Sequence, residues 1–264
     1  AAQQAGLQTV VTSRSFLEKA GVELPPGLQP VWVDEIASTA TTSERFGAMV
    51  RALLWPIPWL EKFAGAERQI TNQDLATVIF SSGSTGEPKG AMLSHYNIVS
   101  NMMQLNQVFD FKRDDRFLGV LPFFHSLGFT ATLIGPSILG VGAAYHPLPT
   151  DTRSISKLIP HYKLTLLLAT PTFLQLYLRG CKPEQMETIN LVVVGAEKLP
   201  ARLADAFKEK FGIQPLEAYG CTECSPGVAV NTPSLVDGKI DQSGNRPGTI
   251  GRALPGMSIR IVNP

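Results

Sequence analysis

The chain has 264 residues, of which 44% are hydrophobic and 17% are charged, so it can bury a substantial core and is not a disordered protein. Its 23 basic and 22 acidic residues leave a formal net charge of +1, which excludes a bulk positive field that would recruit nucleic acid or anionic lipid. Any phosphate group must therefore be bound by a local arrangement of residues. The only three cysteines, Cys181, Cys221 and Cys224, are too few for a disulfide framework and favour a reducing compartment.

The beginning of the chain predicts a strand followed by a helix. Residues 9–12 have strand character, and residues 13–21 read as a helix that ends at a glycine. A second strand is expected at residues 31–33. Because the chain starts abruptly on this unit, we expect that strands preceding it are missing. No secretion signal is visible at its start.

A hydrophobic segment at residues 53–60 contains Trp55 and Trp59 and is flanked by Arg51 and Lys62. Tryptophans beside basic residues are typical of segments that lie at a membrane surface. Packing against the main domain is the alternative, and we favour it.

A strand at residues 76–80 leads into a loop, Ser82–Gly90, that carries three glycines, three hydroxyls and Lys89. Glycines let backbone N–H groups turn toward an anion, and the lysine adds a positive charge. Ser94 is expected to cap a helix after this loop, and a strand, an anion loop and a helix are typical of a nucleotide site. The sequence Pro-Lys-Gly at 88–90 does not fit the Walker A pattern, which argues against an ordinary P-loop NTPase. A flexible linker is the weaker alternative.

Helical and extended patterns alternate through the rest of the chain. Residues 117–150 contain no Asp, Glu, Lys or Arg, but Gly, Pro, Thr and His interrupt the run, so we expect a buried helix and strand rather than a membrane span. Leu203, Phe207 and Phe211 mark one face of a helix. The alternation predicts an α/β fold with a doubly wound, mainly parallel sheet and helices on both faces. The expected helices are 94–107, 126–139, 154–162 and 171–178, and the expected strands are 116–121, 142–146, 164–169 and 191–194.

Three polar clusters follow predicted strands, at the sheet edge where ligands of such folds bind. In the first, His125 could face a phosphate or guard a pocket, and a hydrogen-bonded structural histidine is an equal alternative. The second, Gly195–Lys198, would let a flat ring approach the backbone, or it forms a simple tight turn.

The third cluster, Glu217–Glu223, contains an aromatic ring, a hydroxyl and a carboxylate. Tyr219 could stack on a purine, Thr222 could donate to a phosphate oxygen, and Glu223 could hold Mg²⁺. An ordinary loop with a core tyrosine is the alternative. Cys221 and Cys224 have no second Cys or His pair nearby and enclose an acidic residue, so neither a zinc nor a redox site is favoured.

Two of these motifs together carry a family resemblance. Ser82–Gly90 and Tyr219–Glu223 resemble the adenylate-forming superfamily of acyl- and aryl-CoA synthetases, luciferases and peptide-synthetase adenylation domains. Leu121–Ser126 and Gly248–Gly256 match two further motifs of that superfamily.

Within the superfamily, three segments look most like the acyl-ACP synthetase part of bacterial 2-acylglycerophosphoethanolamine acyltransferase/acyl-ACP synthetase, an enzyme of phospholipid metabolism. They are Pro171–Leu174, Gly195–Pro200 and Tyr219–Pro226. The similarity covers nearly the whole chain and is surest after residue 75.

The resemblance implies the large N-terminal domain core of such an enzyme, truncated before its small C-terminal domain. It divides the chain into three parts. We expect a partial first α/β subdomain with a connecting segment at 1–75, a nucleotide- and acyl-binding α/β subdomain at 76–230, and the start of a truncated β-rich subdomain at 231–264.

The implied activity is that of an acid-thiol ligase. A fatty carboxylate of medium to long chain attacks the α-phosphate of ATP, pyrophosphate leaves, and a phosphopantetheine thiol on acyl carrier protein or CoA takes the acyl group. An aryl or amino-acid adenylating enzyme and a non-catalytic nucleotide- or acyl-binding module stay open as alternatives. The family's ribose-binding aspartate and catalytic lysine would follow Pro264, so we expect these 264 residues alone to bind but to turn over poorly.

The same resemblance assigns roles to residues. Lys89, His125, Thr222 and Glu223 would be catalytic, with Thr222 at the α-phosphate, His125 at the acyl entrance and Glu223 binding Mg²⁺. An apolar tunnel would run beneath Phe129, Ala218 and Gly220. The residues implied to bind ATP are Ser82, Gly83, Ser84, Thr85, Gly86 and Lys89 at the β- and γ-phosphates, and Gly195, Ala196, Glu197, Tyr219, Gly220 and Thr222 around the adenine and α-phosphate.

The remaining expectations concern the setting of the protein. We expect it in the cytoplasm, where it could act at the inner face of the bacterial inner membrane through peripheral contact. No nucleic-acid partner is expected, and the sequence leaves the oligomeric state open.

Overall fold

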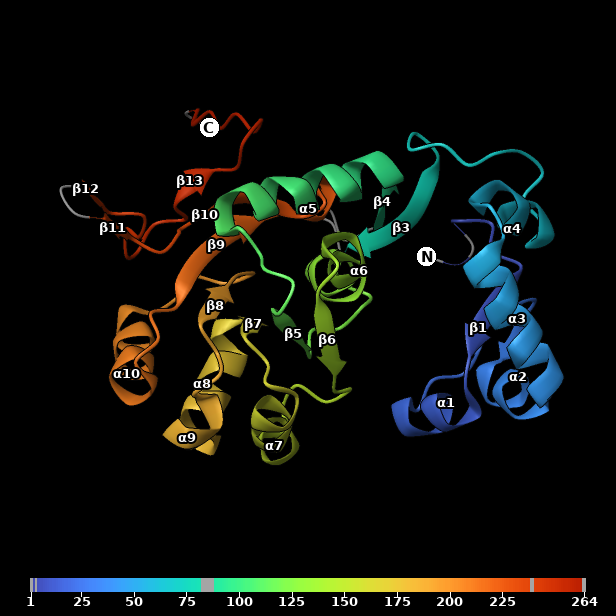
Figure 1. Cartoon of the computed structure of the whole chain (residues 1–264), viewed down its shortest axis with the longest axis horizontal. Coiled ribbons are helices and arrows are strands. Elements are labelled where there is room, and N and C mark those ends of the chain that lie inside the picture. The colour runs from blue at the N-terminus through green and yellow to red at the C-terminus, as the bar shows by residue number, and fades with distance from the viewer. Residues whose placement is uncertain (1, 3, 82–87, 238–239, 263–264) are drawn as a thin grey trace. The chain divides into compact units, whose positions relative to one another are not determined.

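The computed structural model describes residues 2, 4–81, 88–237 and 240–262. The chain divides into two compact units (Figure 1): unit 1 comprises residues 1–74 and 82–90, and unit 2 comprises residues 75–81 and 91–264. Each unit is described by itself.

The described residues of unit 1 form a two-stranded parallel sheet and four helices. Ser13 caps the first helix by accepting a hydrogen bond from Phe16 N–H, and Gly21 ends it in the left-handed conformation, as the sequence predicts. The elements are β1 (Thr9–Thr12), α1 (Arg14–Ala20), β2 (Gln29–Trp32), α2 (Val33–Thr39), α3 (Thr42–Leu54) and α4 (Ile57–Phe63).

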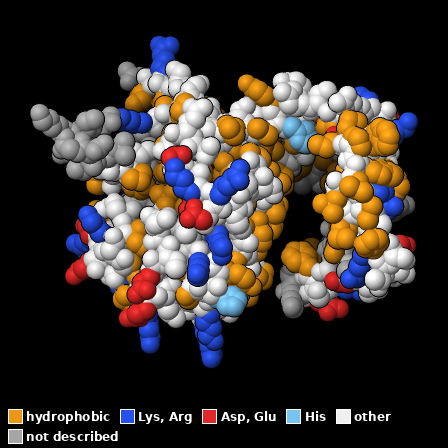
Figure 2. Space-filling model, in the orientation of Figure 1, with side chains coloured by type: hydrophobic (Ala, Val, Ile, Leu, Met, Phe, Trp, Pro, Cys, Tyr) orange, Lys and Arg blue, Asp and Glu red, His pale blue; other side chains and the backbone are white. Residues whose placement is uncertain are grey.

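Helices α3 and α4 present large apolar side chains on the surface of unit 1. Leu53, Leu54 and Ile57 are each at least 70% exposed. Trp55 packs edge-on against Trp59 and Phe63, and Figure 2 shows hydrophobic side chains gathered over the visible face of this unit. The membrane contact considered for residues 53–60 stays a prediction.

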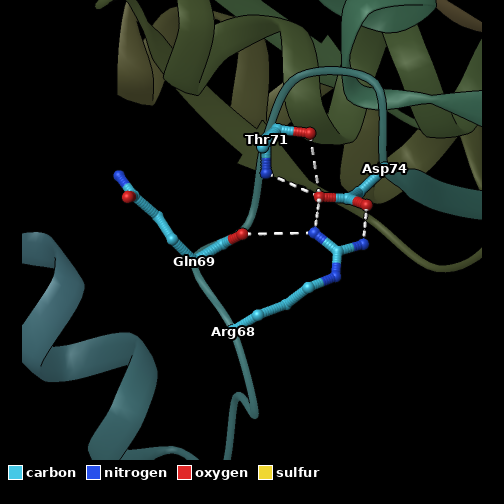
Figure 3. Close-up of polar contacts among 4 residues, drawn as sticks. All are labelled: Arg68, Gln69, Thr71 and Asp74. Atoms are coloured by element: carbon cyan, nitrogen blue, oxygen red, sulfur yellow. Dashed lines mark hydrogen bonds and ion pairs between the residues drawn. The ribbon is translucent and has the colours of Figure 1, made fainter.

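Asp74 fixes the end of the segment 1–74 of unit 1 (Figure 3). Its carboxylate forms a bidentate ion pair with Arg68 and accepts hydrogen bonds from Thr71 N–H at 2.6 Å and from the Thr71 hydroxyl at 3.0 Å. The Arg68 guanidinium, with these donors, holds the pKa of Asp74 well below its usual range. This turn leads directly into the first strand of unit 2.

Unit 2 is built on a seven-stranded sheet with the order β13-β10-β9-β8-β7-β5-β6. The five strands from β9 to β6 in that order are parallel, and β10 and β13 add antiparallel pairs at one side. The predicted α/β class and mainly parallel sheet are therefore confirmed. The strands are β3 (Leu75–Ser81), β4 (Lys89–Ser94), β5 (Arg116–Gly119), β6 (Gly142–Tyr145), β7 (Leu166–Ala169), β8 (Leu191–Val194), β9 (Leu216–Gly220), β10 (Gly227–Val230), β11 (Leu235–Asp237), β12 (Ile240–Gln242) and β13 (Arg252–Ala253).

Helices cover both faces of this sheet, with α5 on one face and α7 to α10 on the other (Figure 1). Each expected helix occurs within a few residues of its predicted bounds. The helical elements are α5 (His95–Phe109), the π-helix η1 (Leu127–Ile134), α6 (Gly135–Leu139), α7 (Thr152–Tyr162), α8 (Pro171–Gly180), α9 (Pro183–Met186), α10 (Ala201–Phe211) and the 3₁₀ turn η2 (Thr222–Cys224).

One of the strands of this unit was not predicted. Residues 89–94 form strand β4, which pairs with β3 in a separate two-stranded sheet. Helix α5 therefore follows a strand and does not directly follow the predicted anion loop. In the structure Leu93 is buried and Met92 is exposed, but both are apolar, so the sequence shows no alternation here. The uncharged run at 117–150 forms β5, η1, α6 and β6, in agreement with the expected strand, helix and strand. Within the described ranges no helix combines the length and the hydrophobicity needed to cross a bilayer.

The main core lies between the sheet and helices α7, α8 and α10. Alternate residues of the central strands, such as Leu167 and Val192, face these helices and are fully buried with Phe207 of α10. Because the side chains of a strand alternate between faces, the remaining strand residues point to the side covered by α5. That side contains the candidate site.

Candidate functional site

A cavity of about 220 Å³ lies in unit 2, lined by the sheet, by α5 and by the loops at the carboxyl ends of the strands. Residues that pair with one another on neighbouring strands form the floor of the cavity, in rows that run across the sheet. Phe117, Leu166 and Leu191 form one row at the amino ends of their strands, and Leu168 and Val193 form the next. Helix α5 covers this floor and contributes Met102, Leu105 and Phe109, which are spaced so that they lie on one face of the helix.

All three polar clusters predicted from the sequence reach the mouth of this cavity. His125 and Ser126 follow β5, Gly195 and Ala196 follow β8, and Tyr219 to Thr222 end β9. The Ser126 hydroxyl lies 3.3 Å from the Thr222 hydroxyl although 96 residues separate them in the chain. Parallel strands place their carboxyl ends at one edge of a sheet, and this explains the convergence.

Close backbone packing holds the two loops that meet there. A Cβ on Gly128 would lie 2.1 Å from the Pro122 carbonyl oxygen, and a Cβ on Gly220 would lie 2.3 Å from the Pro226 carbonyl oxygen. Both positions therefore require glycine. The imidazole of His125 is oriented because its Nδ1 accepts a hydrogen bond from Leu127 N–H at 3.3 Å.

The side-chain amides of Asn101 and Gln104 join α5 to neighbouring segments at the side of the cavity. Asn101 is 2% exposed, and its side chain accepts from Gly227 N–H at 2.9 Å and donates to the Gly227 carbonyl at 2.8 Å. Gln104 donates to the Pro255 carbonyl at 2.7 Å. These bonds hold α5 against β10 and the segment after β13.

The described residues that line the cavity include no Asp, Glu, Lys or Arg. Its only titratable side chains, His125, Tyr219 and Cys221, lie at the mouth. Burial raises the pKa of the Cys221 thiol to about 11, and a hydrogen bond with the neighbouring Cys224 thiol adds to the rise. The interior of the cavity thus suits an uncharged, apolar group.

Glu223 lies on the other side of the turn that carries Thr222. It borders a separate pocket of about 240 Å³ together with Asn97, Ser100 and Ser225. The Ser225 hydroxyl is buried and has no hydrogen-bond partner among the described residues.

The residues fit Mg²⁺ only if another molecule supplies most of its ligands. The described parts of the chain contain no group of three or more His, Cys, Asp or Glu side chains that could hold a metal. Mg²⁺ is commonly bound by one or two carboxylates together with substrate phosphates, and the exposed carboxylate of Glu223 is compatible with that mode.

Two predicted site residues are placed elsewhere. Glu197 does not line the cavity, and it accepts a hydrogen bond from the Thr172 hydroxyl at 3.3 Å beside a surface depression between α8 and α10. Phe129 packs against the small core of Ile79, Leu93 and Ile98 instead of covering the tunnel. The reason is helical geometry, since Leu127 and Ala131 occupy the cavity side of η1 and Phe129 lies between them in sequence.

The predicted phosphate loop is only partly described. Ser82, Gly83, Ser84, Thr85 and Gly86 lie outside the described residues. Lys89 is the first residue of β4 and is exposed.

Sequence reasoning missed the contribution of α5 and of the loop after it. Met102, Leu105 and Phe109 share one helix face, which indicated a buried side but not a cavity. Phe111 lies in the loop after α5 and also lines the cavity. No short motif marked it.

Comparisons of the chain with known proteins agree on one family. A family model described as AMP-binding enzyme matches residues 3–264. The chain is 28% identical over 204 residues to a medium-chain-fatty-acid–CoA ligase of Ectopseudomonas oleovorans, covering 74% of this chain and 36% of the relative. It is 30% identical over 197 residues to a probable 4-coumarate–CoA ligase of Dictyostelium discoideum, covering 72% and 34%.

A solved structure of ATP-bound MatB from Rhodopseudomonas palustris matches the fold with a TM-score of 0.74 and 26% identity. The match covers all of this chain and 48% of that one. The chain therefore spans about a third of the length of these two curated relatives and about half of the solved chain.

Proposed function

Because the chain belongs to the AMP-binding enzyme family, we propose that the complete protein uses ATP to activate a fatty acid to acyl-AMP and then transfers the acyl group to a phosphopantetheine thiol. The observation that carries this proposal is a cavity that is apolar along its length and polar at its mouth. A fatty acid has the same division between an alkyl chain and a carboxylate.

The cavity argues for a fatty acid over the other acids that relatives activate. An amino acid would bring an ammonium group, and burying an unpaired charge is costly. Within the described lining no carboxylate is available to pair with it. An aromatic acid is the second candidate, because about 220 Å³ exceeds the ~150 Å³ of an apolar cavity that binds benzene.

In the proposed first step, a carboxylate oxygen attacks the α-phosphorus, and the bond from that phosphorus to the bridging oxygen of pyrophosphate breaks. Charge develops on the phosphoryl oxygens, so a donor fixed near them lowers the barrier. We assign this role to the Thr222 hydroxyl, whose neighbour Ser126 restrains it at 3.3 Å. Mg²⁺ bound by Glu223 would neutralise part of the phosphate charge.

The nucleotide would occupy the same mouth. Tyr219 is 48% exposed beside Gly195 and Ala196, and an exposed ring can stack on adenine. His125 stands at the entrance of the cavity. The phosphate roles of Ser82 to Gly86 and Lys89 rest on the family resemblance, and Glu197 would need to leave Thr172 to reach the adenine.

In the second step, a thiolate attacks the acyl carbonyl carbon and AMP leaves with the electron pair of the broken C–O bond. The thiol would belong to CoA or to acyl carrier protein, and nothing in the described part of unit 2 favours one over the other. The expected cytoplasmic setting and the expected slow turnover of these 264 residues alone remain parts of this proposal.

Exchange of labelled pyrophosphate into ATP tests the first step directly. The complete protein should show exchange that depends on a saturated fatty acid, and benzoate, 4-coumarate and a set of amino acids should support much less. Exchange that depends on an aromatic or amino acid instead would contradict the proposal.

The variant Thr222→Val tests the assigned donor. Removing one transition-state donor typically lowers kcat by ~10²- to 10³-fold. Thr150→Val is the matched control, because Thr150 is exposed and does not line the cavity, so its exchange rate should stay at the wild-type level. A wild-type exchange rate in Thr222→Val would rule out the assigned role.

A further inference from the structure

The far end of the cavity is aromatic. Phe117 belongs to the row at the amino ends of the strands, next to Leu166. Phe111 lies 5.7 Å from Phe117 and 5.7 Å from Phe109, measured between ring centroids. The three rings therefore form a continuous group, and all three line the cavity.

These rings lie opposite the polar mouth. On β8, Leu191 belongs to the far row, Val193 to the middle, and Gly195 lies at the mouth just after the strand. Gly195 still continues the ladder, since its N–H donates to the Ala169 carbonyl at 3.1 Å. The cavity thus extends along the strand direction.

The register gives the depth of the cavity. Four residue steps from Leu191 to Gly195 correspond to about 13 Å at ~3.3 Å per residue. An extended alkyl chain with bonds of about 1.5 Å advances roughly 1.3 Å per carbon. About ten carbons would therefore fill the distance from the mouth to the aromatic end.

We propose that Phe109, Phe111 and Phe117 form a stop that sets the acyl chain length at about ten carbons. The inference rests on the proposed function and narrows its substrate class to medium-chain saturated acids. The described residues at this end offer no polar side chain, so the stop would contact a terminal methyl group and not a hydroxyl or second carboxylate.

Phe111 is the most informative of the three to change. It is half-buried in the loop after α5, whereas Phe117 is 1% exposed in a central strand, so truncating Phe111 disturbs the fold least. A phenylalanine side chain reaches about 5 Å, which corresponds to roughly four carbons of an alkyl chain.

The experiment measures fatty-acid-dependent pyrophosphate exchange by the complete protein with saturated acids of six to eighteen carbons. Wild type should prefer acids near ten carbons. In Phe111→Ala the optimum should move to longer acids by about four carbons, and the kcat/KM ratio of tetradecanoate to decanoate should rise at least ~10-fold. Phe111→Leu gives the same direction with a smaller shift and serves if the alanine variant folds poorly.

Two further variants sharpen the test. Leu168→Phe adds bulk to the middle row and should move the optimum below ten carbons. Phe211→Ala removes a ring on the opposite face of the sheet, where Phe211 packs 4.7 Å from Phe207, so it should leave the chain-length preference unchanged.

The outcomes separate the inference from the function it rests on. If wild type activates acids from eight to eighteen carbons equally, or if Phe111→Ala keeps the wild-type preference, the stop is refuted and fatty-acid activation stands. If no saturated acid supports exchange, both fail. The predicted shifts in opposite directions for Phe111→Ala and Leu168→Phe would support the stop.

Discussion

Cys221 and Thr222 are adjacent at the mouth of the cavity, and their surroundings set their chemistry. Cys221 is half-buried, its N–H donates to the Pro226 carbonyl at 2.9 Å, and burial raises the pKa of its thiol to about 11. The thiolate is the nucleophilic form of cysteine, so at neutral pH Cys221 is held as an unreactive thiol. The hydroxyl of Thr222, in contrast, is available beside Ser126.

The raised pKa of Cys221 predicts how the rate of its alkylation depends on pH. Alkylation of Cys221 by iodoacetamide in the folded protein should increase about tenfold per pH unit from pH 7 to pH 10 without levelling off. In the urea-unfolded chain the rate should level off above about pH 8.5, the ordinary thiol pKa. Mass spectrometry of the peptide that contains Cys221 measures both profiles, and a folded-state plateau below pH 9 would contradict the assignment.

The raised pKa of the Cys221 thiol also makes the free energy of unfolding depend on pH. The folded state binds the thiol proton more tightly than the unfolded state does. This contribution to the free energy of unfolding is therefore fully present below about pH 8.5 and is lost as the pH rises toward 11.

At the scale of elements, the site depends on how α5 is attached to the sheet. Asn101 satisfies both backbone groups of Gly227, in the way that a neighbouring strand would. Buried backbone groups that lose their partners cost free energy, so Asn101, together with Gln104, holds the helix that covers the cavity in place.

Asn101→Ala should lower the free energy of unfolding by about 1 to 3 kcal/mol, because it leaves the Gly227 N–H and carbonyl unpaired. Asn106→Ala, on the same helix, is the control, since that side chain makes no hydrogen bond to the described residues. Urea unfolding followed by circular dichroism compares the two. An Asn101→Ala midpoint equal to that of Asn106→Ala would show that the contact to Gly227 does not stabilise the fold.

The elements themselves were largely predictable because they depend on local patterns. Short-range spacing predicts the helix cap at Ser94 and the four-residue strand at 191–194. It also predicts the helix face that carries Leu203, Phe207 and Phe211. Strand β4 was missed because a short apolar run does not distinguish a strand from a helix start.

The site was predictable only where motifs mark strand ends. His125, Gly195, Ala196 and Thr222 were expected together because parallel strands end at a common edge. Phe111 and Glu197 show the limit of such reasoning. The contacts of Phe111 with Phe109 and Phe117 depend on the path of a loop, and the direction of Glu197 depends on Thr172, which lies 25 residues earlier in the chain.

At the scale of the whole molecule, the described cavity and its mouth belong entirely to unit 2. One sheet supplies its floor through alternate residues, while the intervening residues build the main core on the opposite face. The same strands therefore contribute both to the substrate site and to the stability of the unit. For a substitution in the cavity rows, the free energy of unfolding should be measured together with the activity.

A fatty acyl group is expected to fill the apolar cavity with its carbonyl end at Thr222, and the other proposals depend on this placement. A crystal structure of the complete protein with decanoyl-sulfamoyl-adenosine, a stable mimic of acyl-AMP, tests it most directly. We predict that the alkyl chain runs over Val193 to Leu191 and ends against Phe111, with the sulfamoyl group within hydrogen-bond distance of the Thr222 hydroxyl. An alkyl chain bound outside this cavity, with Phe111 and Leu191 free of contact, would contradict the account.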